Sequence, residues 1–189
     1  KNLTGKIGIG HTRWATHGEP NDTNAHPHLS FSENISIIHN GIIENYAALK
    51  EQLQLRGYQF RSDTDTEVLV NLIEDIQKNE QLNLFEAVRV ALNKVVGAYA
   101  IVLLSKDEPN QLIAARKGSP LVIGIGEGEF FIASDATPIV EHTKNVVYLN
   151  DEEIALLNLD GELVIKTIQN QYKTPYIEAL EMQIEALEK

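Results

Sequence analysis

Residues 10–28, which read GHTRWATHGEPNDTNAHPH, concentrate the side chains of this chain that could do chemistry: four of the six histidines, the only tryptophan and an arginine. The guanidinium fork of Arg13 matches a carboxylate in two parallel hydrogen bonds. The alternation of polar and apolar residues over 6–9 predicts a strand, and continued alternation would place Arg13 on the face of Ile7 and Ile9. A guanidinium on that face is expected to meet an anion. An ordinary surface ion pair is the alternative.

Asn40 and Gly41 form a second candidate for chemistry, at the end of a strand predicted over residues 34–39. Asn-Gly usually marks a tight turn. Here apolar residues at helical spacing follow, so we expect the pair to join a strand to a helix that stops near Gly57. The amide side chain and the unobstructed backbone N–H could hold a developing oxyanion, and such donors are typically worth roughly 10²–10³ in rate each. A plain turn is the alternative.

The clustered histidines could also indicate zinc. We expect His26 and His28, which alternate along an extended segment, to point in opposite directions, and the chain has no cysteine. The sequence therefore predicts no metal site, and histidines that are structural or contact a substrate.

The segment SDTDTE at residues 62–67 predicts the start of a helix, because Thr64 and Glu67 have the spacing of a capping box. The segment lacks the glycine and the terminal glutamate that a calcium-binding loop requires at fixed positions. Asp65 either belongs to the cap alone or also meets a ligand.

Two further helices and a series of strands complete the expected elements. One helix is predicted from Asn83, and another over the tail from Thr174, with Pro175 at its first position. Between them, seven patterns predict strands joined by turns: AYAIVLL, QLIAAR, LVIGIG, EFFIAS, NVVYL, EIALLNL and ELVIKTI. Clustered helices beside many consecutive strands indicate an α+β fold with antiparallel sheets.

The composition excludes several classes of function. The length of 189 residues suits one domain, or one domain with a short appendage. The formal net charge of −11 would repel a phosphate backbone, so we expect no nucleic acid partner. The sequence lacks an apolar run of about 18 residues, so no membrane association is expected. The absence of cysteine excludes disulfides and a cysteine nucleophile within these residues.

The motifs HTRWATHG, NAHPH, HNGIIENYAALKEQL, SDTDTEV, GAYAIVLL, ARKGSPLVIG and FIASD, in that order, resemble one family. It is the class II, N-terminal-nucleophile glutamine amidotransferases, and in particular the glutaminase domain of the glutamine–fructose-6-phosphate aminotransferases. The resemblance covers essentially the whole chain. It implies a four-layer αββα sandwich of antiparallel sheets, truncated at the N-terminus. It also implies a glutaminase domain over residues 1–172 and a linker helix over residues 173–189 that leads to an absent sugar isomerase domain.

The resemblance also implies roles for individual residues. Arg13 would bind the α-carboxylate of glutamine, with Thr16 and His17 beside it, and Asp65 would take the α-ammonium group. Asn40 and Gly41 would form the oxyanion hole. His26 would support the glutamine pocket, and Trp14 would act as a gate for ammonia. No metal or organic cofactor is implied.

The family's nucleophile is a cysteine at the N-terminus, on a strand upstream of the matched region. We therefore expect this chain alone to be inactive. In the parent enzyme, ammonia from L-glutamine would be passed to fructose-6-phosphate for amino sugar biosynthesis, leaving L-glutamate. A homo-oligomer and a cytoplasmic location follow from the same resemblance. Another class II enzyme, such as an amidophosphoribosyltransferase, and a non-catalytic amino-acid-binding module are the alternatives.

Overall fold

The computed structural model describes residues 4–14 and 18–180. Its helical elements are the 3₁₀ turn η1 (Asp22–Asn24), α1 (Tyr46–Leu55), α2 (Asp65–Glu80) and α3 (Leu84–Leu92). The strands are β1 (His28–Leu29), β2 (Ile35–Ile43), β3 (Gly97–Ser105), β4 (Gln111–Lys117), β5 (Val122–Ile125), β6 (Phe130–Ala133), β7 (Asn145–Tyr148), β8 (Glu153–Asn158), β9 (Leu163–Thr167), β10 (Tyr172–Lys173) and β11 (Glu178–Ala179). None of these helices combines the length and hydrophobicity needed to cross a bilayer.

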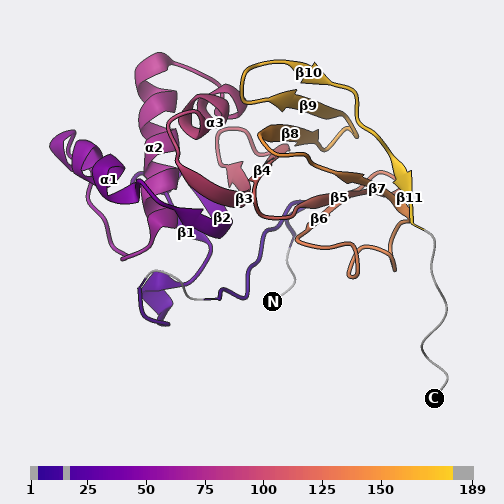
Figure 1. Ribbon diagram of the computed structural model, residues 1–189, viewed down its shortest axis with the longest axis horizontal. Helices are drawn as coiled ribbons and strands as arrows, with labels where there is room; N and C mark the ends of the chain where they lie inside the picture. Colours follow the sequence, from indigo (N-terminus) through magenta and orange to yellow (C-terminus); the bar gives the residue numbers. More distant parts are fainter. Residues whose placement is uncertain (1–3, 15–17, 181–189) are drawn as a thin grey trace.

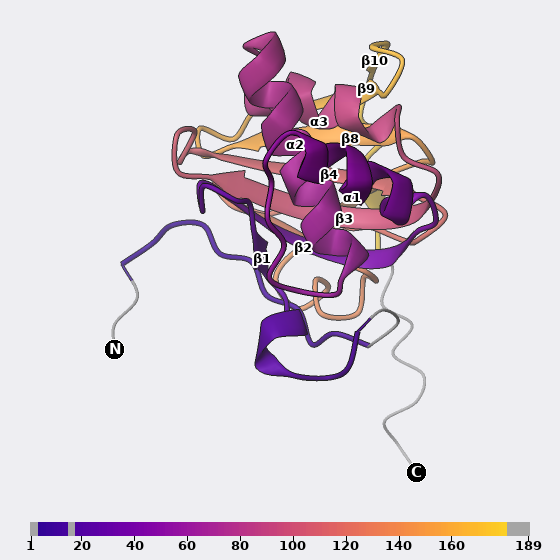
Figure 2. The ribbon, with the colours of Figure 1, turned by 90° about the vertical axis from the view of Figure 1, so that its left-hand side faces the viewer.

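Two antiparallel sheets pack face to face, and the three helices cover the outer face of the larger sheet (Figures 1 and 2). The larger sheet has the order β1-β2-β3-β4-β8-β9-β10, and the smaller sheet has the order β11-β7-β5-β6. On the outer face of the smaller sheet, Ile139 from the turns over 136–143 packs on Val122 and Val146. In the described residues, turns thus occupy the fourth layer. The predicted α+β sandwich of antiparallel sheets is confirmed.

The strand β3 shows why the central strands read as continuous apolar runs. Tyr99, Ile101 and Leu103 face the helices and belong to the core between the helices and the larger sheet. Ala100 and Val102 face the other way and belong to the core between the two sheets. Because side chains alternate along a strand, a strand covered on both faces needs apolar residues at every position.

The predicted helix starts at Thr64 and Asn83 are confirmed. The Thr64 hydroxyl accepts a hydrogen bond from the Glu67 N–H at 3.2 Å, and the Asn83 side chain accepts one from the Glu86 N–H at 2.9 Å. The capping box is not reciprocal, however. The Glu67 carboxylate accepts instead from the N–H groups of residues 61 and 62, at 2.9 and 2.7 Å, and so holds the loop that leads into α2.

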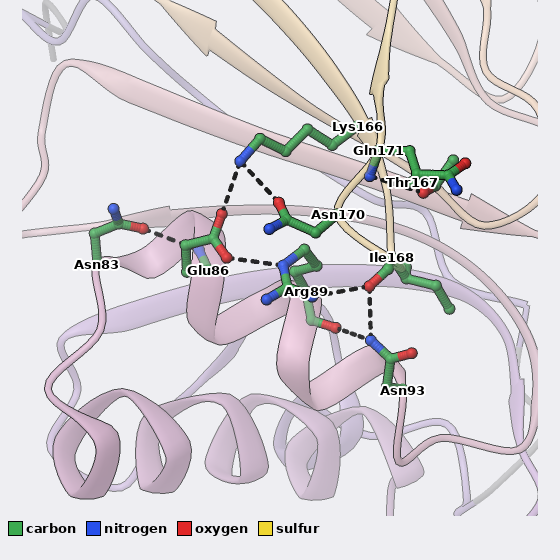
Figure 3. A network of polar contacts seen from close by, with 9 residues as sticks. All are labelled: Asn83, Glu86, Arg89, Asn93, Lys166, Thr167, Ile168, Asn170 and Gln171. Carbon is green, nitrogen blue, oxygen red and sulfur yellow. Dashed lines mark hydrogen bonds and ion pairs between the residues drawn. The ribbon is translucent and has the colours of Figure 1, made fainter.

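A polar network ties α3 to the end of β9 (Figure 3). Glu86 forms ion pairs with Arg89 and Lys166, and the side chains of Arg89 and Asn93 both donate to the Ile168 carbonyl, at 3.0 and 2.9 Å. Burial raises the pKa of Glu86, but hydrogen bonds from Arg89 and Lys166 outweigh it, so the net pKa is lowered. The network holds the helix layer against the strands that follow it in the chain.

Three predicted elements are wrong. Residues 6–9 form no strand, and Asn40–Gly41 is no turn, because β2 runs through it to Ile43. Residues 174–180 form no helix; Glu178 and Ala179 pair instead with β7. Those two residues find hydrogen-bond partners in a strand more than thirty positions earlier, which a local capping signal cannot reveal. Residues 181–189 lie outside the described residues, and the expected boundary at 172/173 stays a prediction.

Candidate active site

A small pocket forms where the N-terminal segment, β2 and the start of α2 meet. Four segments that are far apart in the sequence line it: His11, Arg13, Trp14, His26, His39, Asn40, Gly41, Thr64, Asp65 and Thr66. Six of the eight residues for which the sequence predicts site roles therefore lie around one pocket: Arg13, Trp14, His26, Asn40, Gly41 and Asp65. The other two, Thr16 and His17, lie outside the described residues.

Gly41 occupies a position in β2 that only glycine can take. Its φ of +138° is unfavourable for residues with a side chain, and a Cβ there would lie 2.2 Å from the Ala98 carbonyl oxygen of β3. On β3, Gly97 pairs with Ile43; it has a φ of +127°, and a Cβ there would lie 2.1 Å from the Ile42 carbonyl oxygen. The Asn-Gly pair therefore permits a close approach of two strands and does not form a turn.

Asn40 and His39 lie on opposite faces of β2. His39 is buried, with 4% exposure, on the side of the helices. Asn40 is exposed and lines both the pocket and the adjacent cleft between the sheets. This alternation leaves the Asn40 amide open to a ligand while its neighbour is held by the protein.

Asp65 begins α2 and is 3% exposed. Its Oδ2 accepts a hydrogen bond from the Ile43 N–H at 2.8 Å. A carboxylate in the first turn is stabilised by the positive end of the helix dipole. Asp65 thus holds the end of β2 and also presents negative charge to the pocket, so it does more than begin the helix.

Two threonine hydroxyls flank Asp65, and together they contact three histidines. The Thr66 Oγ1 lies 3.1 Å from His26 Nε2 and 3.0 Å from His39 Nδ1. The Thr64 Oγ1 lies 3.1 Å from His28 Nε2. The sequence interpretation missed this arrangement, although the pattern Thr-Asp-Thr at a helix start was the signal that could have revealed it.

The expectation that His26 and His28 point in opposite directions is wrong. Their ring centroids are 4.9 Å apart, and those of His26 and His11 are 4.6 Å apart. Side chains two residues apart in an extended segment share a face, and it is neighbours in sequence that oppose each other.

These histidine rings are hydrogen-bonding groups whose charged forms are disfavoured. Burial, followed by the charges of His28, His11, His39 and Arg13, lowers the pKa of His26 to about 3. Burial also lowers the pKa of His11 and of His28. Among residues 4–14 and 18–180, no group of three or more histidine, aspartate or glutamate side chains is arranged to hold a metal ion.

Arg13 lines the pocket from a segment that is not a strand, so the argument from the strand face is wrong. It has a φ of +49°, and its guanidinium donates to the carbonyls of Gly18 and Glu19, at 3.1 and 3.3 Å. The Glu19 carbonyl also accepts from the buried side chain of Asn24 at 3.0 Å. Asn24, which sequence reasoning missed, therefore holds the loop that Arg13 contacts.

Trp14 is 92% exposed and contributes to the lining of two cavities. It lines the pocket and also the neighbouring cleft between the sheets, which is bordered by Ile38, Val102 and Leu121. Trp14 is thus shared by the linings of the pocket and the cleft.

Comparisons with known proteins agree on the family. The sequence profile of the glutamine amidotransferase domain matches residues 2–174. The glutamine–fructose-6-phosphate aminotransferase (isomerizing) of Bacteroides thetaiotaomicron is 58% identical over 189 residues, which are the whole of this chain and 31% of that protein. Its counterpart from Chlorobaculum tepidum is 56% identical over 188 residues, 99% of this chain and 30% of that protein. The chain thus spans about a third of the length of these relatives.

A solved structure gives the same result for the fold. The glutamine phosphoribosylpyrophosphate amidotransferase of B. subtilis, complexed with ADP and GMP, superposes with a TM-score of 0.69 at 25% identity, over 84% of this chain and 34% of that one. The profile match over most of the chain, and relatives at more than half identity, settle the classification. The chain belongs to the glutamine amidotransferase domain family.

Proposed function

We propose that the pocket binds L-glutamine by its α-amino acid group. Arg13 takes the α-carboxylate, with Thr16 and His17 beside it, and Asp65 takes the α-ammonium group. The observation that carries the proposal is that Arg13 and Asp65, of opposite charge, line one pocket together with Asn40 and Gly41. An amino acid zwitterion requires such a pair of charges.

The same proposal assigns the chemistry to β2. The Asn40 side chain and the Gly41 N–H stabilise the oxyanion that forms when the amide carbon of glutamine is attacked. His26, neutral near pH 7 because its pKa is lowered to about 3, supports the wall of the pocket through Thr66. Trp14, which lines both the pocket and the cleft, gates the departure of ammonia.

The whole protein is proposed to be a glutamine–fructose-6-phosphate aminotransferase, as its relatives are named. A cysteine attacks the amide, the C–N bond breaks, ammonia leaves for fructose-6-phosphate, and water releases L-glutamate from the thioester. The chain holds no cysteine, so the nucleophile and its base lie outside these 189 residues, and the chain alone is expected to be inactive. A sugar isomerase domain of the same parent chain, a homo-oligomer and a cytoplasmic location belong to the same proposal.

Calorimetric titration of this chain with L-glutamate tests the amino acid pocket, with a circular dichroism spectrum to establish folding. We expect binding that disappears in Arg13→Ala and in Asp65→Asn. Asn83→Ala is the matched control, because it removes a hydrogen bond at the start of α3, away from the pocket. Binding that survives in both pocket variants would refute the assignment. Absence of binding by a folded chain would mean that these residues do not form the site without further residues of the parent protein.

A further inference from the structure

The start of α2 holds β2 at two points, one on each side of Gly41. The Asp65 carboxylate accepts from the Ile43 N–H at 2.8 Å. The Thr66 hydroxyl contacts His39 Nδ1 at 3.0 Å. Consecutive residues of the helix thus fix β2 two residues before and two residues after the glycine with the unusual φ. We name this pair of contacts the β2 clamp.

The Thr66 half of the β2 clamp is built into the protein interior. Thr66 is 1% exposed and His39 is 4% exposed, so bulk water does not replace the hydroxyl when it is removed. The same hydroxyl also contacts His26 Nε2 at 3.1 Å. A hydroxyl carries one proton to donate, so at least one of the two rings must direct an N–H toward it. Thr66 therefore restricts the tautomers and the orientation of both rings.

His39 is joined directly to Asn40 through the backbone of β2, and their side chains lie on opposite faces. A change in how His39 is held is therefore transmitted to Asn40, the next residue of the strand, which also lines the pocket. The charged partners for the amino acid group, Arg13 and Asp65, do not contact the Thr66 hydroxyl through any of the hydrogen bonds described for it. His26, the other partner of the hydroxyl, lines the wall of the pocket but is assigned neither charge that binds the amino acid group. We therefore expect loss of the hydroxyl to affect the oxyanion site more than ground-state binding.

We propose that Thr66 is a positioning residue for the oxyanion site formed by Asn40 and Gly41, and that it acts through His39. The proposal rests on the proposed function of the pocket. Because the oxyanion exists only in the transition state and the tetrahedral intermediate, its misplacement lowers kcat and leaves KM for glutamine nearly unchanged.

The test measures glutamate release from L-glutamine by the complete protein that contains this chain. Thr66→Val removes the hydroxyl at nearly constant volume, and Thr66→Ser keeps it. We expect Thr66→Val to lower kcat about tenfold with KM changed by less than about twofold, and Thr66→Ser to retain most of the activity. Asn83→Ala, which removes a hydrogen bond at the start of another helix, controls for a general loss of stability and should leave both constants unchanged. Thr66→Ala replaces Thr66→Val if the valine variant does not fold.

A double-mutant cycle with His39→Leu tests whether Thr66 acts on the oxyanion site through His39. If Thr66 acts through His39, adding Thr66→Val to His39→Leu produces little further loss of kcat. Several results would overturn the proposal: an unchanged kcat in Thr66→Val, an equal loss in Thr66→Ser, a raised KM at constant kcat, or additive losses in the cycle. A wild-type protein that releases no glutamate would refute the proposed function itself, and this inference with it.

Discussion

Lowering the pH from about 7 to about 5 should destabilise this chain through His26. The ring contacts the Thr66 hydroxyl and lies within 5 Å, between centroids, of the rings of His11 and His28. Burial and then the neighbouring positive charges lower its pKa from 6.5 to about 3. In the unfolded chain the same ring is solvated and titrates near 6.5.

The direction of the change in unfolding free energy depends on whether the folded or the unfolded chain binds the proton. Below pH 6.5 the unfolded ring is protonated and the folded ring is not, so acidification favours unfolding. The stabilisation is complete above pH 6.5 and is lost progressively as the pH falls toward 3. Each pH unit is worth about 1.4 kcal/mol, which gives about 2 kcal/mol at pH 5 as an upper limit. Because the ring is partly exposed, solvent screens part of this penalty, and we expect about 1 kcal/mol.

The histidines and the carboxylates change the stability of the chain over different pH ranges. The pKa values of Glu74 and Glu86 lie below their ordinary value of 4.5, so their contributions to stability are lost only at lower pH. Urea unfolding followed by circular dichroism should be measured at several pH values between about 7 and about 5. In His26→Gln, the fall in unfolding free energy over this range should be smaller by about 1 kcal/mol than in the wild type. His142→Gln, at an exposed site, is the control. An unchanged fall in His26→Gln would show that this ring is not the source of the pH dependence.

Three further changes test the site and the sheet that carries it. Arg13→Lys keeps the charge but loses the guanidinium fork, so calorimetry should show weaker binding of L-glutamate by about tenfold; equal affinity would exclude Arg13 as the carboxylate ligand. Asn40→Ala should lower kcat for glutamine hydrolysis in the complete protein by about 10² with little change in KM, and an effect on KM alone would indicate ground-state binding. Gly97→Ala should reduce the unfolding free energy by about 3 kcal/mol or more, because its Cβ would lie 2.1 Å from a carbonyl oxygen; a wild-type urea midpoint would contradict this.

The elements that the sequence predicts correctly are those specified by local chemistry. The seven strand patterns after residue 97 correspond to β3–β9, because each is bounded by turn residues and is apolar enough to be buried on at least one face. Thr64 and Asn83 cap their helices through hydrogen bonds that span only three residues. All the residues that specify such a strand or helix cap lie within a short stretch of sequence.

The errors concern residues whose conformation depends on distant partners. Asn40–Gly41 has the composition of a turn, yet the pair is held in a strand by β3, nearly sixty residues later. The side chain of Thr66 looks like part of a helix cap, and its contacts with His26 and His39 come from positions 40 and 27 residues away. The family resemblance predicts roles for Arg13 and Asp65, and both line the pocket, whereas the threonine and histidine contacts beside them depend on the fold.

Two glycines, Gly41 of β2 and Gly97 of β3, set a limit on how this pocket can be redesigned. An added Cβ at Gly41 or Gly97 would lie 2.2 or 2.1 Å from a carbonyl oxygen of the neighbouring strand, so neither residue can acquire a side chain while the strands keep their spacing. A combinatorial library that randomises either position would be depleted of folded members before any selection for a new substrate began. Diversity is better placed at Trp14, which lines the pocket, is largely exposed and is not needed for strand pairing. Altered substrate preference in this domain should therefore arise from exchange of side chains on a backbone that stays the same.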